Sequence, residues 1–498
     1  MINSICILGG GTSGLIAALM IRKAYPNFKI TMIESSNIGI IGVGEGTTEH
    51  WRFFVEYCEI PLHELFEQTG ATFKIGIKFT NWHGDGSHYF HSLLEDFAGV
   101  DPKSDIPYTW YRMIGEKWDP LHTLGNGSQK SRHYEPLHEN INQFHFDTAK
   151  LNTFLHNKCA ERNITVIDTT IKEVKLDDSG HVESLVDSTD CIHAYDFYID
   201  CSGFKRVIGD KLGLKWIDKS EFLPMNSAIA FQTPYQEDIP SYTEATALSS
   251  GWSWRIPTQD RFGNGYVYCD RFIDDCAAVL EIKEHYEKHL SISDISIGKK
   301  FKFSAGHVDK FWTKNCAVIG LSSIFVEPLE ASSIGTTIQQ CANLIATIKH
   351  YTKGEESTAR QYNKLMIQIS DNIVDFIQLH YFTQRNDTEF WRWCKQSLKI
   401  TDFNKENLDY FKKNNVDNNF FREPLLLFKT LNFMQVMHGL RQIEHTHSLD
   451  VYNSHCREKY DNDIEKMLIL NSDLTQSIPH RECIEILKKR VPVIQYKF

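Results

Sequence analysis

A glycine-rich loop near the N-terminus constrains the fold of this sequence more than any other feature. Residues 2–8 (INSICIL) predict a short buried strand, and residues 15–20 (LIAALM) predict the helix that follows. The loop between them, residues 9–14 (GGGTSG), fits G-x-G-x-x-G. Its first glycine permits a tight turn, its second lets the backbone approach a pyrophosphate, and its third permits close helix packing. With a second strand predicted over residues 29–34, the chain begins as a dinucleotide-binding βαβ unit.

The choice of dinucleotide depends on two further features. Glu34 follows Gly14 at about the spacing of the acid that binds a ribose in such units. The alternative is a plain glycine turn with a solvated glutamate. Residues 316–320 (CAVIG) predict a late strand followed by a loop and a helix. In two-lobed FAD proteins such a late strand returns the chain to the flavin, so FAD is favoured over NAD.

Size and charge restrict the class of partner. A chain of 498 residues with 42% hydrophobic content buries a large core, as two packed lobes or two to three domains. Its net charge of −11 repels nucleic acid and anionic membranes, so a small molecule is the expected partner. We expect a soluble cytoplasmic protein, because no apolar stretch reaches membrane-spanning length and no signal peptide is evident. A homo-oligomer is left open.

The 12 cysteines are scattered, without a C-x-x-C pair or a His/Cys cluster at zinc spacing. This usage disfavours a disulfide framework and a structural metal, and fits a reducing cytoplasm.

A lysine lies in a strand-like segment, residues 73–79 (FKIGIKF). Phe73, Ile75, Ile77 and Phe79 alternate with the other residues and would share the core face, whereas Lys74 and Lys78 share the opposite face. Two lysines on one strand face are usually a solvated surface, and the residues alone leave that alternative open.

A second helix start is predicted after residue 330. Apolar residues recur at helical spacing from Ile334 onward, so Ser332 or Ser333 is a natural N-cap. The free N–H groups of Ser332, Ser333 and Ile334 would favour an anion. The alternative is an ordinary serine-capped helix that binds no ligand.

Several ordered motifs resemble one known family. Residues 251–257 (GWSWRIP) match the W-x-W-x-I-P motif of the flavin-dependent tryptophan halogenases, and the N-terminal glycine loop is also similar. The resemblance extends through residues 42–45 (GVGE), 73–82 (FKIGIKFTNW), 200–204 (DCSGF) and 325–330 (FVEPLE). We interpret Trp252 and Trp254 as structural.

The resemblance implies a fold and a mechanism. The fold is α/β, a two-lobed FAD-dependent monooxygenase-like fold. A FAD-binding and catalytic module would cover residues 1–350, with a Rossmann-type part and a mixed sheet. A mainly helical region over 351–498, predicted for example at 367–382 and 463–470, would cap the substrate pocket. FADH2 from a separate flavin reductase would react with oxygen to a flavin hydroperoxide, which oxidises halide to hypohalous acid.

The family's lysine and glutamate fall on Lys74 and Glu330. Lys74 would receive the oxidant through a tunnel, hold it by hydrogen bonding or as a haloamine, and pass electrophilic halogen to an aromatic substrate. Burial lowers a lysine pKa and makes either role accessible. Glu330 would orient the oxidant or accept the ring proton; the alternative is that it caps the following helix.

The candidate binding residues form three groups. The FAD site is expected to include Gly9, Gly11, Thr12, Ser13, Gly14, Glu34, Gly44, Glu45, Ile171, Gly320, Leu321 and Ile334. Ser332 and Ser333 are the halide candidates, and His91, Leu93 and Phe428 are the substrate candidates. No residues are assigned to a metal.

The sequence departs from the family at the substrate and halide residues. The family clamps indole between a histidine, a phenylalanine and a tryptophan, but Leu93 replaces the phenylalanine and Phe428 is the nearest equivalent of the tryptophan. We therefore expect an indole- or phenol-like substrate other than free tryptophan. The halide turn has Ser333 in place of glycine, which would change the permitted backbone angles and the local volume. A preference for bromide or iodide would follow.

Two other functions compete with halogenation. An aromatic hydroxylase would use the same oxygen chemistry, but such enzymes usually carry Gly-Asp where this chain has Gly320-Leu321. A non-catalytic FAD-binding protein would have no need of Lys74 and Glu330.

Overall fold

The glycine loop joins the elements of the predicted βαβ unit. The computed structural model describes residues 2–39, 44–92, 130–131, 143–237, 239–293, 295–413, 420–421, 425–442 and 478–489. β1 (Ser4–Leu8) leads into α1 (Thr12–Ala24), and the chain returns as β2 (Lys29–Glu34), which pairs with β1 in parallel. The buried, uninterrupted apolar residues of both strands explain this pairing, since a parallel sheet is covered on both faces.

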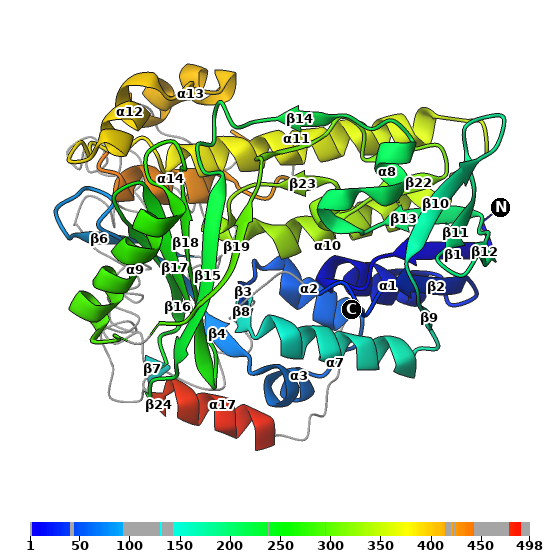
Figure 1. The fold of residues 1–498 in the computed structure, drawn as a ribbon, viewed down its shortest axis with the longest axis horizontal. Helices are drawn as coiled ribbons and strands as arrows, with labels where there is room; N and C mark the ends of the chain where they lie inside the picture. The colour runs from blue at the N-terminus through cyan, green and yellow to red at the C-terminus, as the bar shows by residue number, and fades with distance from the viewer. Residues whose placement is uncertain are drawn as a thin grey trace, which may run out of the picture.

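The βαβ unit is the centre of a six-stranded sheet with the order β21-β22-β13-β1-β2-β9 (Figure 1). Its other strands are β9 (Thr165–Asp168), β13 (Phe197–Asp200), β21 (Trp312–Thr313) and β22 (Cys316–Val318). β22 is the predicted late strand and pairs in parallel with β13. Ile5 and Ile7 of β1 face the main core, while Cys6 and Leu8 face a second apolar layer. The sheet therefore lies between two layers.

These two layers have different components. α1 packs with α10 (Ser332–Ile348) and α7 (Thr148–Glu161) on one side. On the other side lie a small antiparallel sheet and a short helix: β10 (Ile171–Leu176), β11 (Val182–Asp187), β12 (Ile192–His193) and α8 (Val207–Lys211).

A seven-stranded sheet forms the second lobe, with the order β19-β15-β18-β17-β16-β5-β6. Its strands are β5 (Gly76–Thr80), β6 (His88–Ser92), β15 (Ser227–Pro234), β16 (Tyr242–Ala247), β17 (Gly251–Pro257), β18 (Arg261–Tyr268) and β19 (Ile297–Lys302). Only β5 and β16 pair in parallel. α9 (Asp275–Leu290) packs on this sheet through Ala278, Ile282 and Tyr286. The mixed sheet expected beside the Rossmann-type part is present.

The single strand predicted over residues 73–79 is wrong, because the chain changes sheets at Ile75. β4 (Thr72–Lys74) pairs with β8 (Gln143–Phe146), which also pairs with β3 (Glu45–Gly46). β5 then joins the seven-stranded sheet. The Ile75 N–H donates to Ser241 O at 2.8 Å and marks this junction. Lys74 therefore ends a strand in a small sheet between the two lobes.

The remaining elements connect or cover the sheets. They are α2 (His50–Tyr57), α3 (Leu62–Thr69), β7 (Lys130–Ser131), η1 (Gly203–Lys205), β14 (Trp216–Asp218), β20 (Gly306–Val308), η2 (Gly320–Ser322), β23 (Ile324–Phe325), η3 (Pro328–Glu330) and β24 (Ile478–Pro479).

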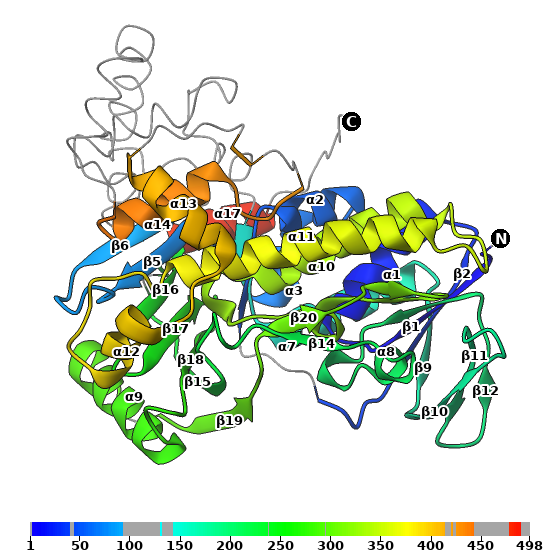
Figure 2. The ribbon, with the colours of Figure 1, turned by 90° about the horizontal axis from the view of Figure 1, so that it is seen from above.

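Beyond residue 350 the described chain is mainly helical, as predicted. The helices are α11 (Ser357–Leu379), α12 (Glu389–Ser397), α13 (Asp402–Lys413), α14 (Thr430–Gly439) and α17 (His480–Lys489). α11 runs along both lobes (Figures 1 and 2), and contains the helix predicted over 367–382 except its last three residues. The segment 463–470 lies outside the described residues. No helix in the described ranges is both long and apolar enough to cross a membrane.

Candidate active site

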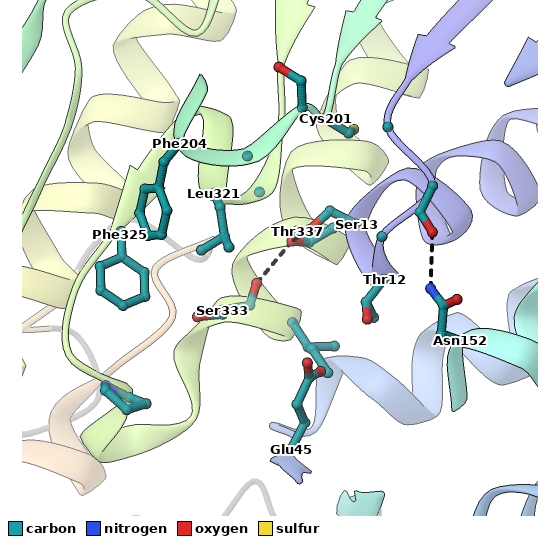
Figure 3. Close-up of a pocket in the computed structure, with 18 of the residues that line it drawn as sticks. Thr12, Ser13, Glu45, Asn152, Cys201, Phe204, Leu321, Phe325, Ser333 and Thr337 are labelled. Atoms are coloured by element: carbon teal, nitrogen blue, oxygen red, sulfur yellow. Dashed lines mark hydrogen bonds between the residues drawn. The ribbon is translucent and has the colours of Figure 1, made fainter. Parts of the chain in front are cut away.

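One cavity of about 990 Å³ lies where the glycine loop, the start of α10 and the seven-stranded sheet meet (Figure 3). It opens at the carboxyl ends of β1 and β2, where open parallel sheets bind ligands. The predicted FAD and halide residues on its wall are Gly9, Gly11, Thr12, Ser13, Glu34, Gly44, Glu45, Ile171, Gly320, Leu321, Ser332, Ser333 and Ile334. Gly14 is buried behind the loop instead of lining the cavity. The fold thus brings together residues separated by more than 300 positions.

The glycine loop presents backbone, not side chains, to this cavity. Gly9 has φ +118°, and a Cβ there would lie 2.3 Å from Cys201 O. A Cβ on Gly14 would lie 1.9 Å from Gly9 O, so this glycine permits close packing of the helix, as predicted. Gly11 is the N-cap of α1 and no side chain caps the helix. The first N–H groups of α1 are therefore available to phosphate.

Glu34 ends β2 beside the loop, but its surroundings include two residues that sequence reasoning missed. His156 Nε2 lies 3.2 Å from Glu34 Oε2, and the hydrogen bond to Glu34 raises the pKa of His156. Asn152 donates from Nδ2 to Gly10 O at 2.9 Å (Figure 3). Both side chains come from one face of α7 and belong to no motif, so only the folded chain identifies them.

The second helix start differs from the prediction in its cap. Ala331, not Ser332 or Ser333, is the N-cap of α10; it has φ +53° and no side chain caps the helix. Ser332 and Ser333 are the first two helical residues, so their N–H groups are free of helix partners. The backbone of Ser333 has right-handed helical angles, which any residue can adopt, so this position does not require glycine. The expectation that serine in place of glycine changes the backbone angles here is wrong. The left-handed residue is Ala331.

The starts of α1 and α10 lie side by side. Ser13 Oγ and Thr337 Oγ1 are 3.2 Å apart. Gly320 (φ +65°) approaches so closely that a Cβ on it would lie 2.1 Å from Ser13 Oγ. Two uncapped helix N-termini without acidic residues in their first turns therefore face the same cavity. Their helix dipoles favour anions, such as the phosphates of a dinucleotide or a halide ion.

Glu45 supplies a protonatable group to the cavity wall. Its Oε2 is buried without a partner among the described residues. Burial raises the pKa of Glu45 to about 7. A cavity with free helix N-termini, a ribose-type acid and an unsatisfied buried carboxyl group fits a flavin dinucleotide. Gly42 and Val43 of the same motif lie outside the described residues.

Lys74 does not line the cavity but is buried behind Gly46, which does, with 1% of its surface exposed. Its Nζ donates to Thr47 O at 2.9 Å. Burial lowers the pKa of Lys74 to about 8, although Glu330 and Glu49 oppose the shift. Lys78 is only partly buried, and its Nζ lies 5.6 Å from the Tyr242 ring centroid. A solvated pair of strand lysines is therefore excluded.

Glu330 is held between two histidines. Its Oε2 lies 2.8 Å from His91 Nδ1 and its Oε1 lies 2.8 Å from His380 Nε2, with all three side chains fully buried. Burial by itself raises the pKa of Glu330, but electrostatic attraction to His91 and His380 and the hydrogen bonds from both rings outweigh burial and lower it to about 2. The alternative that Glu330 caps α10 is wrong, since no side chain caps that helix.

The orientation of His91 follows from a helix in the C-terminal region. The Lys429 N–H donates to Asn432 Oδ1 at 2.7 Å, which leaves Asn432 Nδ2 as a donor to His91 Nε2 at 3.1 Å. His91 therefore accepts at Nε2 and donates from Nδ1 to Glu330. Neither Asn432 nor His380 belongs to a motif that sequence reasoning used.

The predicted substrate residues converge on one aromatic ring. Phe428 stacks on Phe376 with ring centroids 4.0 Å apart, and the His91 ring lies 5.4 Å from the same ring. His91 and Phe428, far apart in sequence, therefore lie against the same ring, that of Phe376. Leu93 lies outside the described residues.

The two tryptophans of the W-x-W motif are mostly buried and border the cavity. Trp252 Nε1 donates to Glu327 Oε2 at 2.7 Å, and the Tyr381 hydroxyl donates to the same oxygen at 2.6 Å. Burial raises the pKa of Glu327 to about 7. These bonds tie β17 and α11 to the segment that carries Glu330.

Comparison with known proteins agrees with this geometry. A sequence model of the tryptophan halogenase family matches residues 4–453. Tryptophan 6-halogenase SttH from Streptomyces toxytricini is 31% identical over 432 residues, 79% of this chain and 81% of that protein. Tryptophan 7-halogenase RebH from Lentzea aerocolonigenes is 30% identical over 443 residues, 82% of each chain. The solved structure of a flavin-dependent halogenase from Xanthomonas campestris superposes with a TM-score of 0.85 at 28% identity, covering 98% of both chains.

Proposed function

We propose that this chain, which belongs to the tryptophan halogenase family, halogenates an indole- or phenol-like aromatic other than free tryptophan, with bromide or iodide preferred to chloride. It is a flavin-dependent halogenase, an oxidoreductase that uses FADH2 from a separate flavin reductase together with halide. The observation that carries the proposal is the burial of the Lys74 amine behind Gly46, a residue of the cavity wall. A solvated lysine could not guard a reactive oxidant.

The cofactor is assigned to the cavity on the strength of its helix starts. The N–H groups of Thr12 and Ser13 would bind the pyrophosphate, Glu34 the ribose, and the segment from Gly320 to Ile334 the ring system. Bound reduced FAD supplies the electrons for oxygen reduction, and the halide is oxidised in turn. Ser332 and Ser333 would hold that halide through their free N–H groups.

Lys74 is assigned the transfer of oxidised halogen. With a pKa of about 8, it is mainly ammonium at neutral pH, with an accessible amine fraction. The ammonium would hydrogen-bond hypohalous acid, and the amine would form a haloamine. Either species passes electrophilic halogen to an aromatic carbon, and Glu330 orients the oxidant or accepts the ring proton. A carboxylate with a pKa of about 2 suffices for that last step, because a halogenated ring cation is a strong acid.

The substrate is assigned to the side of Lys74 lined by His91 and Phe428. The clamp residues of the family are altered here, and we assign the mainly helical residues 351–498 to the cap of this pocket. The sequence shows no evident match to the residues that bind the amino-acid group of tryptophan in the family, and a pocket that lacked such partners would discriminate against free tryptophan, because buried charged groups require partners.

A matrix of halides and substrates tests the proposal. Wild type, Lys74→Ala and Lys78→Ala are supplied with photoreduced FADH2, oxygen and chloride, bromide or iodide. The probes are indole, 3-methylindole, phenol and free tryptophan, and products are measured by mass spectrometry. We expect halogenated indole or phenol from wild type and Lys78→Ala, and none from Lys74→Ala, which still oxidises FADH2.

Each part of the proposal has an outcome against it. Unchanged halogenation by Lys74→Ala removes the lysine from the reaction. Free tryptophan as the best substrate by kcat/KM contradicts the substrate assignment, and clear priority for chloride contradicts the halide preference. Hydroxylated product without halide would replace halogenation with hydroxylation.

A further inference from the structure

Gly46 lies between the flavin cavity and the Lys74 amine. A Cβ on Gly46 would lie 3.4 Å from Lys74 Nζ, 3.4 Å from Ala331 Cβ and 3.6 Å from Thr243 Oγ1. Gly46, Ala331 and Thr243 also line the cavity. Since Gly46 has no side chain, the Lys74 amine and the Thr243 hydroxyl both approach the same point at the cavity wall. The Thr243 hydroxyl is therefore a cavity group near the Lys74 amine.

The hydrogen of that hydroxyl is committed to a histidine behind it. Thr72 Oγ1 donates to Pro257 O at 2.8 Å, which uses its one hydrogen. His145 Nδ1 lies 3.1 Å from Thr72 Oγ1 and must therefore be the donor in that contact. Burial and the charge of Lys74 lower the pKa of His145, so its ring is neutral and Nε2 carries no hydrogen. Thr243 Oγ1, 2.9 Å from this Nε2, donates to it.

Thr243 is left with lone pairs. Its oxygen can therefore accept a hydrogen bond at the cavity wall, near the Lys74 ammonium. Hypohalous acid carries one O–H group and a basic oxygen. We propose that Thr243, oriented by His145, accepts a hydrogen bond from hypohalous acid and holds it beside Lys74. This inference rests on the proposed halogenase function and adds two residues to it.

The two contacts orient the acid for transfer. Lys74 donates to the oxygen of hypohalous acid while Thr243 accepts its O–H, so the halogen points away from both. The aromatic carbon attacks the halogen, and the carbon–halogen bond forms as the halogen–oxygen bond breaks. Hydroxide leaves with that electron pair and takes a proton from the Lys74 ammonium to give water. Glu330 takes the ring proton and returns it to Lys74, so the sum is arene plus hypohalous acid to haloarene plus water.

Matched variants on one strand test this role. Thr243→Val keeps the shape and removes the oxygen, whereas Thr243→Ser keeps the hydroxyl. Thr246→Val makes the same change on the opposite face of β16, at a residue with 8% exposure against 7% for Thr243. Each variant receives photoreduced FADH2 and bromide, with indole as the aromatic probe. Escaped oxidant is measured separately by halogenation of monochlorodimedone in the bulk solution.

We expect Thr243→Val to lose about tenfold in bromoindole formed per FADH2 oxidised, a loss of roughly 1.4 kcal/mol in transition-state stabilisation. Monochlorodimedone halogenation should rise in its place. FAD affinity should match wild type, whereas thermal stability should fall modestly in Thr243→Val, because the buried His145 Nε2 loses its donor. Thr243→Ser should restore at least half of the coupling, and Thr246→Val should behave as wild type.

The outcomes against the inference differ from those against the proposed function. Wild-type coupling in Thr243→Val overturns the role of the hydroxyl. Loss of FAD affinity in step with the loss of product shows a structural role and also overturns it. A wild-type chain that halogenates no probe removes the proposed function itself, and this inference with it.

Discussion

His380 Nε2 lies 2.8 Å from Glu330 Oε1, and the other nitrogen of the same ring lies 3.1 Å from Phe376 O. Both ring nitrogens thus face acceptor oxygens. His91 meets the second oxygen of Glu330 at 2.8 Å. The Glu330 carboxylate is therefore kept ionised in a fully buried site by hydrogen-bond donors from two elements, β6 and the end of α11.

Replacing His380 with phenylalanine should show how far the ionisation of Glu330 and the stability of the fold depend on the hydrogen bond from His380. His380→Phe keeps the ring volume but leaves one carboxylate oxygen unpaired, which destabilises the fold by about 1–3 kcal/mol. It also raises the pKa of Glu330, so halogenation becomes dependent on pH and falls about tenfold or more at the acid end. Urea unfolding measures the loss of stability. Bromoindole formation between about pH 5 and about pH 8 measures the pH dependence of halogenation. His380→Gln retains an N–H donor and should recover part of the loss; a wild-type profile in His380→Phe would show that His91 alone suffices.

Local pattern could predict much of this site. The glycine loop, Glu34 and the late strand are signalled by residues adjacent in sequence, because a turn, a helix start and a strand end are local structures. Alternation in residues 73–79 also assigned Lys74 to the correct face, although the chain changes sheets at Ile75. The cap of α10 was less predictable, because Ala331 adopts a left-handed conformation that alanine rarely takes.

The partners of Glu330 could not be predicted in this way. His380 and Asn432 lie 50 and 102 positions from Glu330 and reach it, directly or through His91, only when α11 and α14 pack on β6. A histidine in an apolar helix has the same local pattern whether it packs in a core or contacts a carboxylate. Tertiary contacts of this range carry no local signal.

The buried amine of Lys74 should make the protein less stable at neutral pH. The pKa of Lys74 falls from 10.5 to about 8 on folding. Below pH 8 both states are protonated and the burial penalty is fully present. Between pH 8 and 10.5 the unfolded chain binds a proton that the folded chain lacks, so stability rises with pH. Lys74→Met should therefore stabilise the fold at pH 7 by on the order of 1–3 kcal/mol, with a gain that shrinks toward pH 10.

Thermal unfolding across this pH range measures the effect. Lys78→Met, at a partly exposed position of β5, is the control and should show no such trend. A Lys74→Met variant that is less stable than wild type at pH 7 would mean that contacts of the ammonium outweigh its desolvation.

His480 should link the C-terminal helix to the lysine strand. Its Nε2 accepts from the Phe73 N–H at 3.1 Å and its Nδ1 donates to Ile239 O at 3.0 Å. Burial lowers the pKa of His480 from 6.5 to about 4. As pH falls, His480 is therefore protonated in the unfolded chain before it is protonated in the folded chain. The stability that neutral, buried His480 contributes is complete above pH 6.5 and is lost as pH falls toward 4.

His480→Phe should lower the free energy of unfolding at pH 7 by about 1–3 kcal/mol, because the Phe73 N–H is left without an acceptor. It should also lose less stability than wild type between pH 6.5 and pH 4. Urea titrations followed by tryptophan fluorescence report both quantities, with the exposed His350→Phe as the control. An equal acid dependence in His480→Phe and wild type would assign the titration to another group.

Two opposite changes at Gly46 and Ala331, cavity residues near Lys74, should alter the choice of halide in opposite directions, if the oxidant passes between them. Gly46→Ala adds a Cβ whose nearest neighbours lie at 3.4 Å, an ordinary contact, so the fold and FAD binding should be retained. The methyl group would narrow the route to Lys74, and hypoiodous acid, the largest oxidant, should be hindered most. Ala331→Gly removes a methyl group next to Gly46, at a residue whose φ of +53° glycine adopts without strain. The ratio of iodinated to chlorinated indole is measured by mass spectrometry with equal concentrations of iodide and chloride. We expect this ratio to fall about threefold or more in Gly46→Ala and to rise in Ala331→Gly. About 0.65 kcal/mol of added hindrance in the transition state changes a rate ratio about threefold. If both variants kept the wild-type ratio while binding FAD normally, the oxidant would have to reach Lys74 by a route that does not pass between Gly46 and Ala331.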